Sequence, residues 1–516
     1  MIELYPSEPE YRDAVRSLKL PAIVQLTAKT EAKCTPLDLY ASLRSHNREY
    51  SYLLESVEKE RHHARFSFVG SDPDAVVTVR DHKISFEYRL ETPITRHIAS
   101  SLSEVCDDDD GEIRPEYDVL DALKPIIPDA GFLRRKTFDR QVFLGGAIGY
   151  CGYDIVYDCW LDIKRRKSAA TPDAQFLITS HTIVFDHLTG EIYIVLTPFV
   201  EDLSGEYLTK TYRQAESDAA SLISVIEDAE NAVVSGRNRE GHERRGEMIA
   251  NTNRDVYEAM VRRAKQHIID GDIFQVVLSR RYEGVNSYDP VELYRMLREV
   301  NPSPYMYLFD FDGVGIVGAS PETLFTVHNR KLITNPIAGT CPRGKTDEED
   351  AELAKKLLSD EKEQAEHVML VDLGRNDVRM VSKPGSVKVE DFMTVRKYSH
   401  LQHIESTVTG MLRDDSDAFD ATRAIFPAGT LSGAPKIRAM EIIDALEKDA
   451  RGIYGGGVGY YTWNGDADFA IVIRTIVLDG NRMFIQAGAG IVADSDPTYE
   501  YLETERKMAA MMKVIE

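Results

Sequence analysis

Short strand-like segments recur in adjacent pairs along the chain, and this pairing constrains the fold more than any other sequence feature. The segments are rich in β-branched and aromatic residues and are bounded by turn residues. In the first half of the chain they include YSYLLES, ARFSFVGS, AVVTVR and EIYIVLTP. In the second half they include IFQVVLSRRY, MYLFDF, VGIVGAS, FTVHN, KLITNP, AIVIRTIVLDG and RMFIQAGAGIV. Neighbouring strands with short connections indicate antiparallel pairing.

Helical patterns alternate with the strands in the second half of the chain. They fall at about residues 349–373, 418–426, 435–448 and 497–515. Another helix is expected after Asn253, whose side chain can cap a helix N-terminus. Its apolar positions recur at helical spacing and are Val256, Met260, Ala264 and Ile268. Antiparallel strand pairs with helices over their outer faces predict an α+β fold.

The chain is too long for one simple core. It has 516 residues, whereas single cores stop growing at roughly 250–300 residues. The segment 227–252 is charged, contains Gly236 and Gly241, and interrupts the pattern of strands and helices. We therefore expect an N-terminal region over residues 1–226, a linker over 227–252 and a C-terminal region over 253–516.

Charge and cysteine content exclude several classes of function. The net charge is −23 and the isoelectric point is about 5.1, so nucleic acid and anionic membranes would repel the chain. The five cysteines include no CxxC pair, which fits a reducing cytosol. The N-terminus MIELYPSEPEYRDAV lacks an apolar signal region, and no apolar run approaches the roughly 20 residues of a membrane span. We expect a cytoplasmic protein.

Two of the expected helices each carry two glutamates three residues apart. Glu363 and Glu366 lie in DEKEQAEHVMLVDLGRND, and Glu500 and Glu503 lie in DPTYEYLETERKMAAMM, where Asp496 is the expected N-cap. This spacing places each pair on one helix face, which is most often a solvated face. If the two faces converge, the four carboxylates would repel one another, and a hard cation such as Mg²⁺ would relieve the repulsion. The sequence leaves both alternatives open.

Three glycine-rich segments lie close to these helices in the sequence. They are GTLSGAPKIRAM at 429–440, YGGGVGYYTW at 454–463 and QAGAGIVADSDP at 486–497. Glycine allows a ligand to approach the backbone, and a helix start presents free N–H groups to an anion. In isolation, each segment is more simply explained as a tight turn. Arg474 lies among apolar residues in the strand AIVIRTIV, and a buried arginine needs a partner such as a substrate carboxylate.

Taken together, these segments resemble the chorismate-utilising enzymes. The similarity runs from about Asn253 to the C-terminus and rests on the ordered motifs GDIFQVVLSRR, NPSPYM, GASPE, PIAGT, KEQAEH, DLGRND, HIEST, GTLSGAPKIRAM, YGGGVGY, AGAGIV and YEYLET. The N-terminal region resembles the anthranilate synthase component I branch through LLES at 53–56 and FLGGAIGYCGYD at 143–154. The resemblance implies an αββα sandwich of two antiparallel β-sheets flanked by helices, with the active site between the sheets.

Two positions distinguish the branches of this family. Ala338 stands in PIAGT where relatives that make aminodeoxychorismate carry a lysine, so covalent lysine chemistry is excluded. Gln275 stands in FQVV where isochorismate and salicylate synthases carry a lysine base that activates water. Together with LLES and NPSPYM, these residues favour the large subunit of an anthranilate synthase. Its reaction would convert chorismate and ammonia to anthranilate and pyruvate, the first step of tryptophan biosynthesis.

The resemblance also implies the roles of individual residues. The catalytic residues would be Glu322, His403 and Thr430. Chorismate would be bound by Gly339, Thr340, Tyr454, Arg474, Gly488, Ala489, Gly490 and Lys507. Mg²⁺ would be held by Glu366 and Glu503, with Glu363 and Glu500 acting through waters or behind the direct ligands. Tryptophan, as feedback inhibitor, would contact Glu55, Ser56, Pro304, Tyr305, Met306, Val458 and Tyr460.

The implied reaction needs a source of ammonia. Cys151 belongs to IGYCGYD, which resembles a strand of the synthase family and not the nucleophile elbow of a glutaminase. We therefore expect a separate glutamine amidotransferase subunit, component II, in a heterotetramer. Three alternatives remain: an aminodeoxychorismate synthase component I, an isochorismate or salicylate synthase, and a non-catalytic tryptophan-binding regulatory protein. The presence of the catalytic and metal-binding residue types argues against the last alternative.

Overall fold

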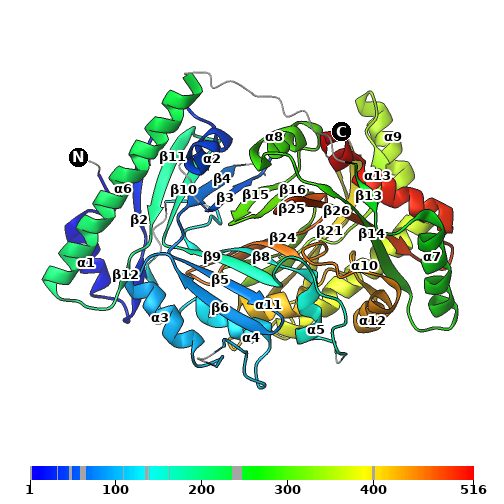
Figure 1. Cartoon of the computed structure of the whole chain (residues 1–516), viewed down its shortest axis with the longest axis horizontal. Coiled ribbons are helices and arrows are strands. Elements are labelled where there is room, and N and C mark those ends of the chain that lie inside the picture. Colours follow the sequence, from blue (N-terminus) through cyan, green and yellow to red (C-terminus); the bar gives the residue numbers. More distant parts are fainter. Residues whose placement is uncertain are drawn as a thin grey trace.

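Two large antiparallel β-sheets pack face to face and carry helices on their outer faces (Figure 1). This arrangement confirms the expected α+β sandwich. The structure is a computed structural model of the chain. The structure describes residues 3–31, 33–45, 49–57, 65–107, 110–133, 137–138, 140–161, 163–234, 247–397 and 401–515.

The first sheet contains twelve strands within these described ranges. In spatial order they are β13 (Ile249–Ala250), β14 (Gln275–Val285), β26 (Arg482–Ile491), β25 (Thr475–Asp479), β16 (Val314–Ser320), β15 (Tyr305–Phe311), β3 (Tyr50–Glu55), β4 (Phe66–Ser71), β10 (His181–Asp186), β11 (Glu191–Leu196) and β2 (Leu26–Thr30), with β22 (Gly433–Ala434) beside β14. The N-terminal and C-terminal parts of the sequence meet in this sheet where β3 pairs with β15.

The second sheet has the same mixed origin. In spatial order its strands are β19 (Ile337–Pro342), β21 (Leu401–Met411), β18 (Lys331–Thr334), β17 (Thr323–His328), β24 (Ala467–Ile471), β23 (Gly457–Thr462), β8 (Gly146–Cys151), β9 (Ala174–Thr179), β5 (Ala75–Arg80) and β6 (Lys83–Tyr88), with β20 (Lys388–Lys397) beside β21. The two parts of the sequence meet here where β8 pairs with β23. A small third sheet contains β12 (Phe199–Val200), β1 (Ala22–Val24) and β7 (Gly131–Leu133).

The helices cover the outer faces of the sandwich. Those that share a core cluster with the first sheet are α1 (Glu8–Val15), α2 (Pro36–Ser45), α6 (Gly205–Val234), α8 (Pro290–Val300) and α13 (Pro497–Ile515). Those in the cluster that includes the second sheet are α3 (Pro93–Leu102), α4 (Val119–Leu123), α5 (Val156–Cys159), α7 (Arg254–Ile269), α10 (Glu361–Val381), α11 (Ala418–Ile425) and α12 (Lys436–Leu446). The remaining ones are α9 (Asp347–Leu358) and the 3-10 turns η1 (Lys124–Ile126) and η2 (Tyr153–Ile155).

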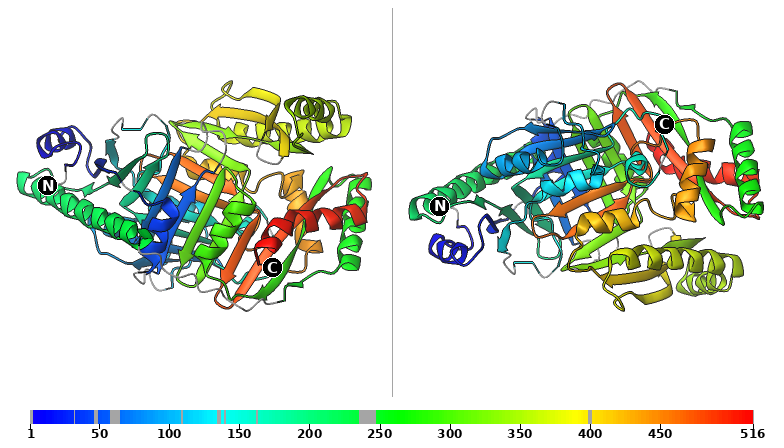
Figure 2. Two further views of the ribbon diagram at one scale, coloured as in Figure 1. Left: turned by 90° about the horizontal axis from the view of Figure 1, so that it is seen from above. Right: turned by 90° about the horizontal axis from the view of Figure 1, so that it is seen from below.

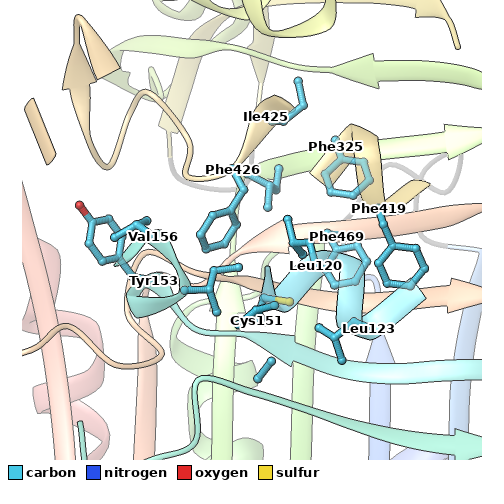
Figure 3. Close-up of a cluster of buried hydrophobic side chains, with 14 of the residues drawn as sticks. Leu120, Leu123, Cys151, Tyr153, Val156, Phe325, Phe419, Ile425, Phe426 and Phe469 are labelled. Carbon is cyan, nitrogen blue, oxygen red and sulfur yellow. The ribbon is translucent and has the colours of Figure 1, made fainter. Parts of the chain in front are cut away.

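Aromatic side chains fill the core between the two sheets and the core on the outer face of the second sheet. Between them, the ring of Phe143 lies 6.0 Å from that of Tyr52 and 5.0 Å from that of Tyr460. On the outer face of the second sheet, Phe419 of α11 and Phe469 of β24 lie in the buried cluster drawn in Figure 3. Burying a side chain of this size contributes roughly 1.5–3 kcal/mol. These contacts fix the sheets that carry the site.

One expected helix and one expected strand are each interrupted in the structure. The helix expected over 349–373 is two helices, because Asp360 caps α10 by accepting hydrogen bonds from the N–H groups of Lys362 and Glu363. The strand expected at AIVIRTIVLDG splits into β24, in the second sheet, and β25, in the first. Periodicity does not show either break, because the apolar pattern continues across both.

The expected boundaries and buried positions were only partly right. Helix α6 continues to Val234, over the first residues of the expected linker, and residues 235–246 lie outside the described residues. In α7, Asn253 caps the helix and Met260 and Ala264 are buried as expected, but Val256 is 52% exposed. Asp496 caps α13 by accepting from the N–H of Tyr499. No described helix combines the length and apolar character needed to cross a membrane.

Candidate active site

Glu322 and Arg474 lie where two neighbouring strands cross from one sheet to the other. The chain leaves β16 of the first sheet and enters β17 of the second through Glu322, and it returns from β24 to β25 through Arg474. The two crossings run side by side, because Ile471 N–H donates to Glu322 O and Ala319 N–H donates to Arg474 O. Arg474 has a φ of 50°, a left-handed conformation that is uncommon for a non-glycine residue.

The Glu322 carboxyl is held by a neighbour from a third segment. The hydroxyl of Thr430, in the loop between α11 and α12, donates to Glu322 Oε1 at 2.8 Å. Burial raises the pKa of Glu322 from 4.5 to about 7, although Thr430, Lys507 and Arg474 each act to lower it. The shift means that desolvation outweighs the charges of two nearby cations. A carboxyl group with this pKa can hold a proton near neutrality and release it to a substrate.

A second group of expected substrate contacts surrounds the glycines of β26. Lys507 Nζ donates to Gly488 O at 3.0 Å. A methyl group placed on Gly488 would lie 3.0 Å from the Tyr454 hydroxyl, so only glycine leaves this approach open. Gly490 is likewise approached by Gln275, whereas Ala489 is fully buried in the core. The backbone of β26 at Gly488 therefore lies directly beside the side chains of Tyr454 and Lys507.

His403 lies with Gly339 and Thr340 at a bulge in the pairing of β19 with β21. Its Nδ1 is 3.0 Å from Thr340 Oγ1 and 3.2 Å from Gly339 O. Gly339 adopts a φ of 68°, and a methyl group there would lie 3.0 Å from Glu363 Oε2. The bulge therefore brings His403, Thr340 and a carboxylate of α10 to one place.

Electrostatic effects connect this bulge to the sheet crossing. Burial lowers the pKa of His403 to about 4, and the charge of Arg474 lowers it further. The charge of Arg474 also lowers the pKa of Glu322. The Arg474 guanidinium donates to the neutral Asn301 Oδ1 at 3.3 Å. The guanidinium of Arg474 therefore lies within electrostatic reach of both Glu322 and His403.

The two glutamate pairs approach one another without forming a closed metal site. Helices α10 and α13 both lie at the end of the molecule opposite the N-terminus (Figure 2). Lys362 of α10 lowers the pKa of Glu500 in α13, which places the start of α10 near the α13 face. Burial and the charge of the neighbouring glutamate raise the pKa of both Glu363 and Glu500.

The carboxylates of Glu366 and Glu503 do not form a metal-binding site with other acidic side chains in the described residues. Glu503 Oε2 accepts from Arg506 at 3.0 Å, and its Oε1 lies 3.9 Å from Lys507 Nζ. Among the residues that the structure describes, no three His, Cys, Asp or Glu side chains lie close enough together to hold a metal ion. The expected four-carboxylate cluster is therefore not assembled here, although its oxygen donors suit Mg²⁺.

The expected tryptophan-binding residues come from both sheets and lie on both sides of the first sheet. Glu55 and Met306 are opposite one another in β3 and β15, and the Glu55 carboxylate accepts from Tyr294 of α8 at 2.7 Å, on the helix side. Tyr305, Val458 and Tyr460 instead belong to the core between the sheets. The half-buried residues Ser56 and Pro304 flank the ends of β3 and β15.

Asp468 is a half-buried acid near Glu322 that the sequence motifs did not single out. It lies in β24, where its Oδ1 accepts from the Tyr305 hydroxyl at 3.0 Å. Burial raises its pKa to about 7. The Tyr305 hydroxyl also lies 3.1 Å from Thr323 Oγ1, next to Glu322 in the chain. In the sequence, Asp468 could have been recognised as an acidic residue within the apolar segment DADFAIV, which is the pattern of a buried carboxyl group.

A half-buried acid with a raised pKa, two nearby cations and a glycine-rich strand suit the binding of a small anionic substrate. Residues 95–513 match the chorismate binding enzymes. Anthranilate synthase component 1 of Haloferax volcanii is 47% identical, with 96% of this chain and 94% of that protein covered. The corresponding Thermococcus kodakarensis protein is 43% identical, with 93% and 97% covered.

Solved structures agree with these relatives. Anthranilate synthase component I from Streptococcus pneumoniae superposes with a TM-score of 0.69 at 36% identity, covering 87% of this chain and 92% of that one. MenF, the menaquinone-specific isochorismate synthase of Escherichia coli, shares the fold with a TM-score of 0.67 at 18% identity. The chain belongs to the chorismate-binding enzyme family and, within it, to the anthranilate synthase component 1 proteins.

Proposed function

We propose that this chain converts chorismate and ammonia to anthranilate and pyruvate, the first step of tryptophan biosynthesis. The observation that carries the proposal is the position of Glu322, an acid with a pKa of about 7, beside Thr430 and Arg474 at the crossing between the sheets. Its similarity to anthranilate synthase component 1 proteins over nearly the whole chain supports the same activity.

Glu322 supplies the proton that the leaving ring hydroxyl requires. With a pKa of about 7, a substantial fraction of Glu322 is protonated at neutral pH, whereas a carboxyl group at 4.5 would be almost fully ionised. The Thr430 hydroxyl fixes the orientation of the carboxyl group. Ammonia then adds beside the ring carboxylate as the hydroxyl leaves.

Arg474, Tyr454 and Lys507 receive the enolpyruvyl carboxylate. Within the described part of the chain, the Arg474 side chain donates to the neutral Asn301, so an incoming carboxylate supplies the charge-assisted partner that a buried arginine needs. The backbone of Gly488 and Gly490 allows the substrate to approach closely. This arrangement solves the local problem of binding a dianion to a protein with a net charge of −23.

His403 acts in the later elimination of pyruvate as a proton acceptor. Its lowered pKa of about 4 keeps the imidazole neutral at physiological pH. Because a carbonyl oxygen can only accept, Nδ1–H donates to Gly339 O, and Nε2 carries the lone pair. A neutral imidazole in this tautomer can remove the ring proton whose loss makes the product aromatic.

Glu366 and Glu503 would hold Mg²⁺, with Glu363 and Glu500 behind them. When bound, the ion would neutralise the ring carboxylate of chorismate. Burial raises the pKa of Glu363 and Glu500, and the charge of the neighbouring glutamate raises each further, so a cation beside them would be favourable.

Ammonia comes from a separate glutamine amidotransferase subunit in a heterotetramer, and tryptophan inhibits the enzyme. The relatives are named as component 1, which implies a second component. Burial raises the pKa of Cys151 to about 12, so this thiol is not a glutaminase nucleophile. Tryptophan inhibition is proposed from the resemblance of LLES and NPSPYM to the feedback pocket of the family.

The purified chain tests the proposal directly. With chorismate, a magnesium salt and an ammonium salt, it should produce fluorescent anthranilate without a partner subunit. Chelation should stop turnover, and tryptophan should reduce it. Formation of the para-amino isomer or of isochorismate would refute the proposed reaction, and tryptophan binding without turnover would identify a regulatory protein instead.

A further inference from the structure

A buried ion pair beyond the catalytic residues joins three segments of the site. Arg451 and Glu447, near the end of α12, are only 4% and 7% exposed. Arg451 Nε donates to Glu447 Oε2 at 3.0 Å and an Arg451 Nη donates to Oε1 at 2.6 Å, a two-point contact. Such paired hydrogen bonds fix relative orientation as well as distance.

The remaining Arg451 donors reach the backbone of two other segments. One Nη group donates to Leu431 O at 2.6 Å, and the other donates to Val277 O at 2.7 Å. Leu431 follows Thr430, whose hydroxyl holds Glu322. Val277 is opposite Gly490 in the pairing of β14 with β26. One guanidinium therefore spans the loop of the catalytic acid and the strand beside the substrate backbone.

Glu447 extends the network to the same strand pair. Its Oε1 accepts from Ser279 N at 2.7 Å and from Ser279 Oγ at 2.9 Å. Ser279 is opposite Gly488 and also accepts from Gln486 Nε2 at 2.8 Å. The backbone of Tyr454 also belongs to this network, because its N–H donates to Arg451 O at 3.2 Å.

We propose that Arg451 and Glu447 are positioning residues, which hold the Thr430 loop, the Gly488–Gly490 backbone and Tyr454 at their working separations. The proposal rests on the function proposed above. Stability alone gives a poor account of the pair, because replacing a buried ion pair by apolar residues is often neutral or stabilising. A substrate site, in contrast, must be held within roughly 0.5 Å, which directional bonds from one rigid group achieve.

The substitution Arg451→Lys tests this role. A lysine is a compact charge with three donors on a flexible stem, and it cannot reproduce the planar contact with Glu447 while reaching both carbonyls. We expect kcat/KM for chorismate to fall on the order of 10- to 100-fold, the effect of misplacement by about 1 Å. Because the Thr430 hydrogen bond lowers the pKa of Glu322, its loosening should also move the alkaline limb of the pH–rate profile to higher pH.

Two further variants keep the test decisive. Ser279→Ala removes one hydrogen bond to Glu447 while leaving the buried charges paired, and should lower kcat/KM about fivefold. Arg65→Lys is the matched control, since Arg65 makes a comparable two-point contact with Asp186 at 3.0 and 2.8 Å, in β10 of the first sheet. It should lower the unfolding midpoint and leave kcat/KM and the pH profile unchanged.

The outcomes separate this proposal from the proposed function. If the parent chain makes no anthranilate, the proposed function fails first. If the parent is active and both Arg451→Lys and Ser279→Ala match its kcat/KM and pH profile, the positioning role is refuted. If Arg451→Lys does not fold, Ser279→Ala decides by the same two measurements.

Discussion

Replacing Glu322 by glutamine should remove activity and stabilise the protein, and the stabilisation should depend on pH. Glutamine keeps the size of the side chain and can still accept the Thr430 hydrogen bond, but it carries no transferable proton. Losing a general acid typically costs on the order of 10²- to 10⁴-fold in rate. We expect a loss of this size in anthranilate formation.

The stability effect follows from the pKa of Glu322. Burial raises it from 4.5 to about 7, so the folded state binds a proton more tightly than the unfolded state. The parent chain therefore loses stability as pH rises from 4.5 through about 7, and the loss is complete above that range. At about 1.4 kcal/mol per pKa unit, the loss is at most about 3.5 kcal/mol, and less where solvent reaches the partly buried carboxyl.

Chemical denaturation at about pH 5 and about pH 8.5 measures this difference. The gap between Glu322→Gln and the parent should grow in favour of the variant as the pH rises. In parallel, the parent rate expressed per unit of free ammonia should fall above pH 7, about tenfold per pH unit. A stability gap that is the same at both pH values, or a variant with parental activity, would refute the assignment of Glu322 as a half-buried acid.

Three further substitutions test the remaining parts of the site. Glu503→Gln should abolish magnesium-dependent turnover, and near-normal rates over a magnesium titration would count against its metal role. Ser56→Phe, at the end of β3, should relieve tryptophan inhibition while sparing the uninhibited rate; an unchanged inhibition curve would remove Ser56 from the inhibitor pocket. His403→Ala should slow pyruvate elimination, so chromatography should reveal an accumulating aminated intermediate, and an unaltered product profile would contradict the role of His403 as a base.

The sequence was sufficient to predict the sheets and the ends of several helices. Paired strand segments predicted antiparallel pairing and an α+β fold. The arrangement of two sheets as a sandwich was predicted from the family resemblance. Asp496 and Asn253 were recognisable as caps, and both caps are present.

The crossing that creates the site could not be predicted in this way. AIVIRTIVLDG is one apolar run, and nothing in its pattern shows that the backbone turns at Arg474 and changes sheets. The half-buried acid Asp468 and the network around Arg451 depend on contacts between residues far apart in the chain. The assignment of Glu322 and Arg474 to one site therefore came from family resemblance, and the structure supplied the physical reason.

A crystal structure of the Glu322→Gln variant with chorismate and Mg²⁺ tests the central claim most directly. The account predicts one chorismate molecule between the sheets, with its enolpyruvyl carboxylate on Arg474 and Tyr454. Its ring carboxylate should share a magnesium ion with Glu366 and Glu503. Chorismate bound elsewhere, or a metal ion ligated by neither glutamate, would contradict it.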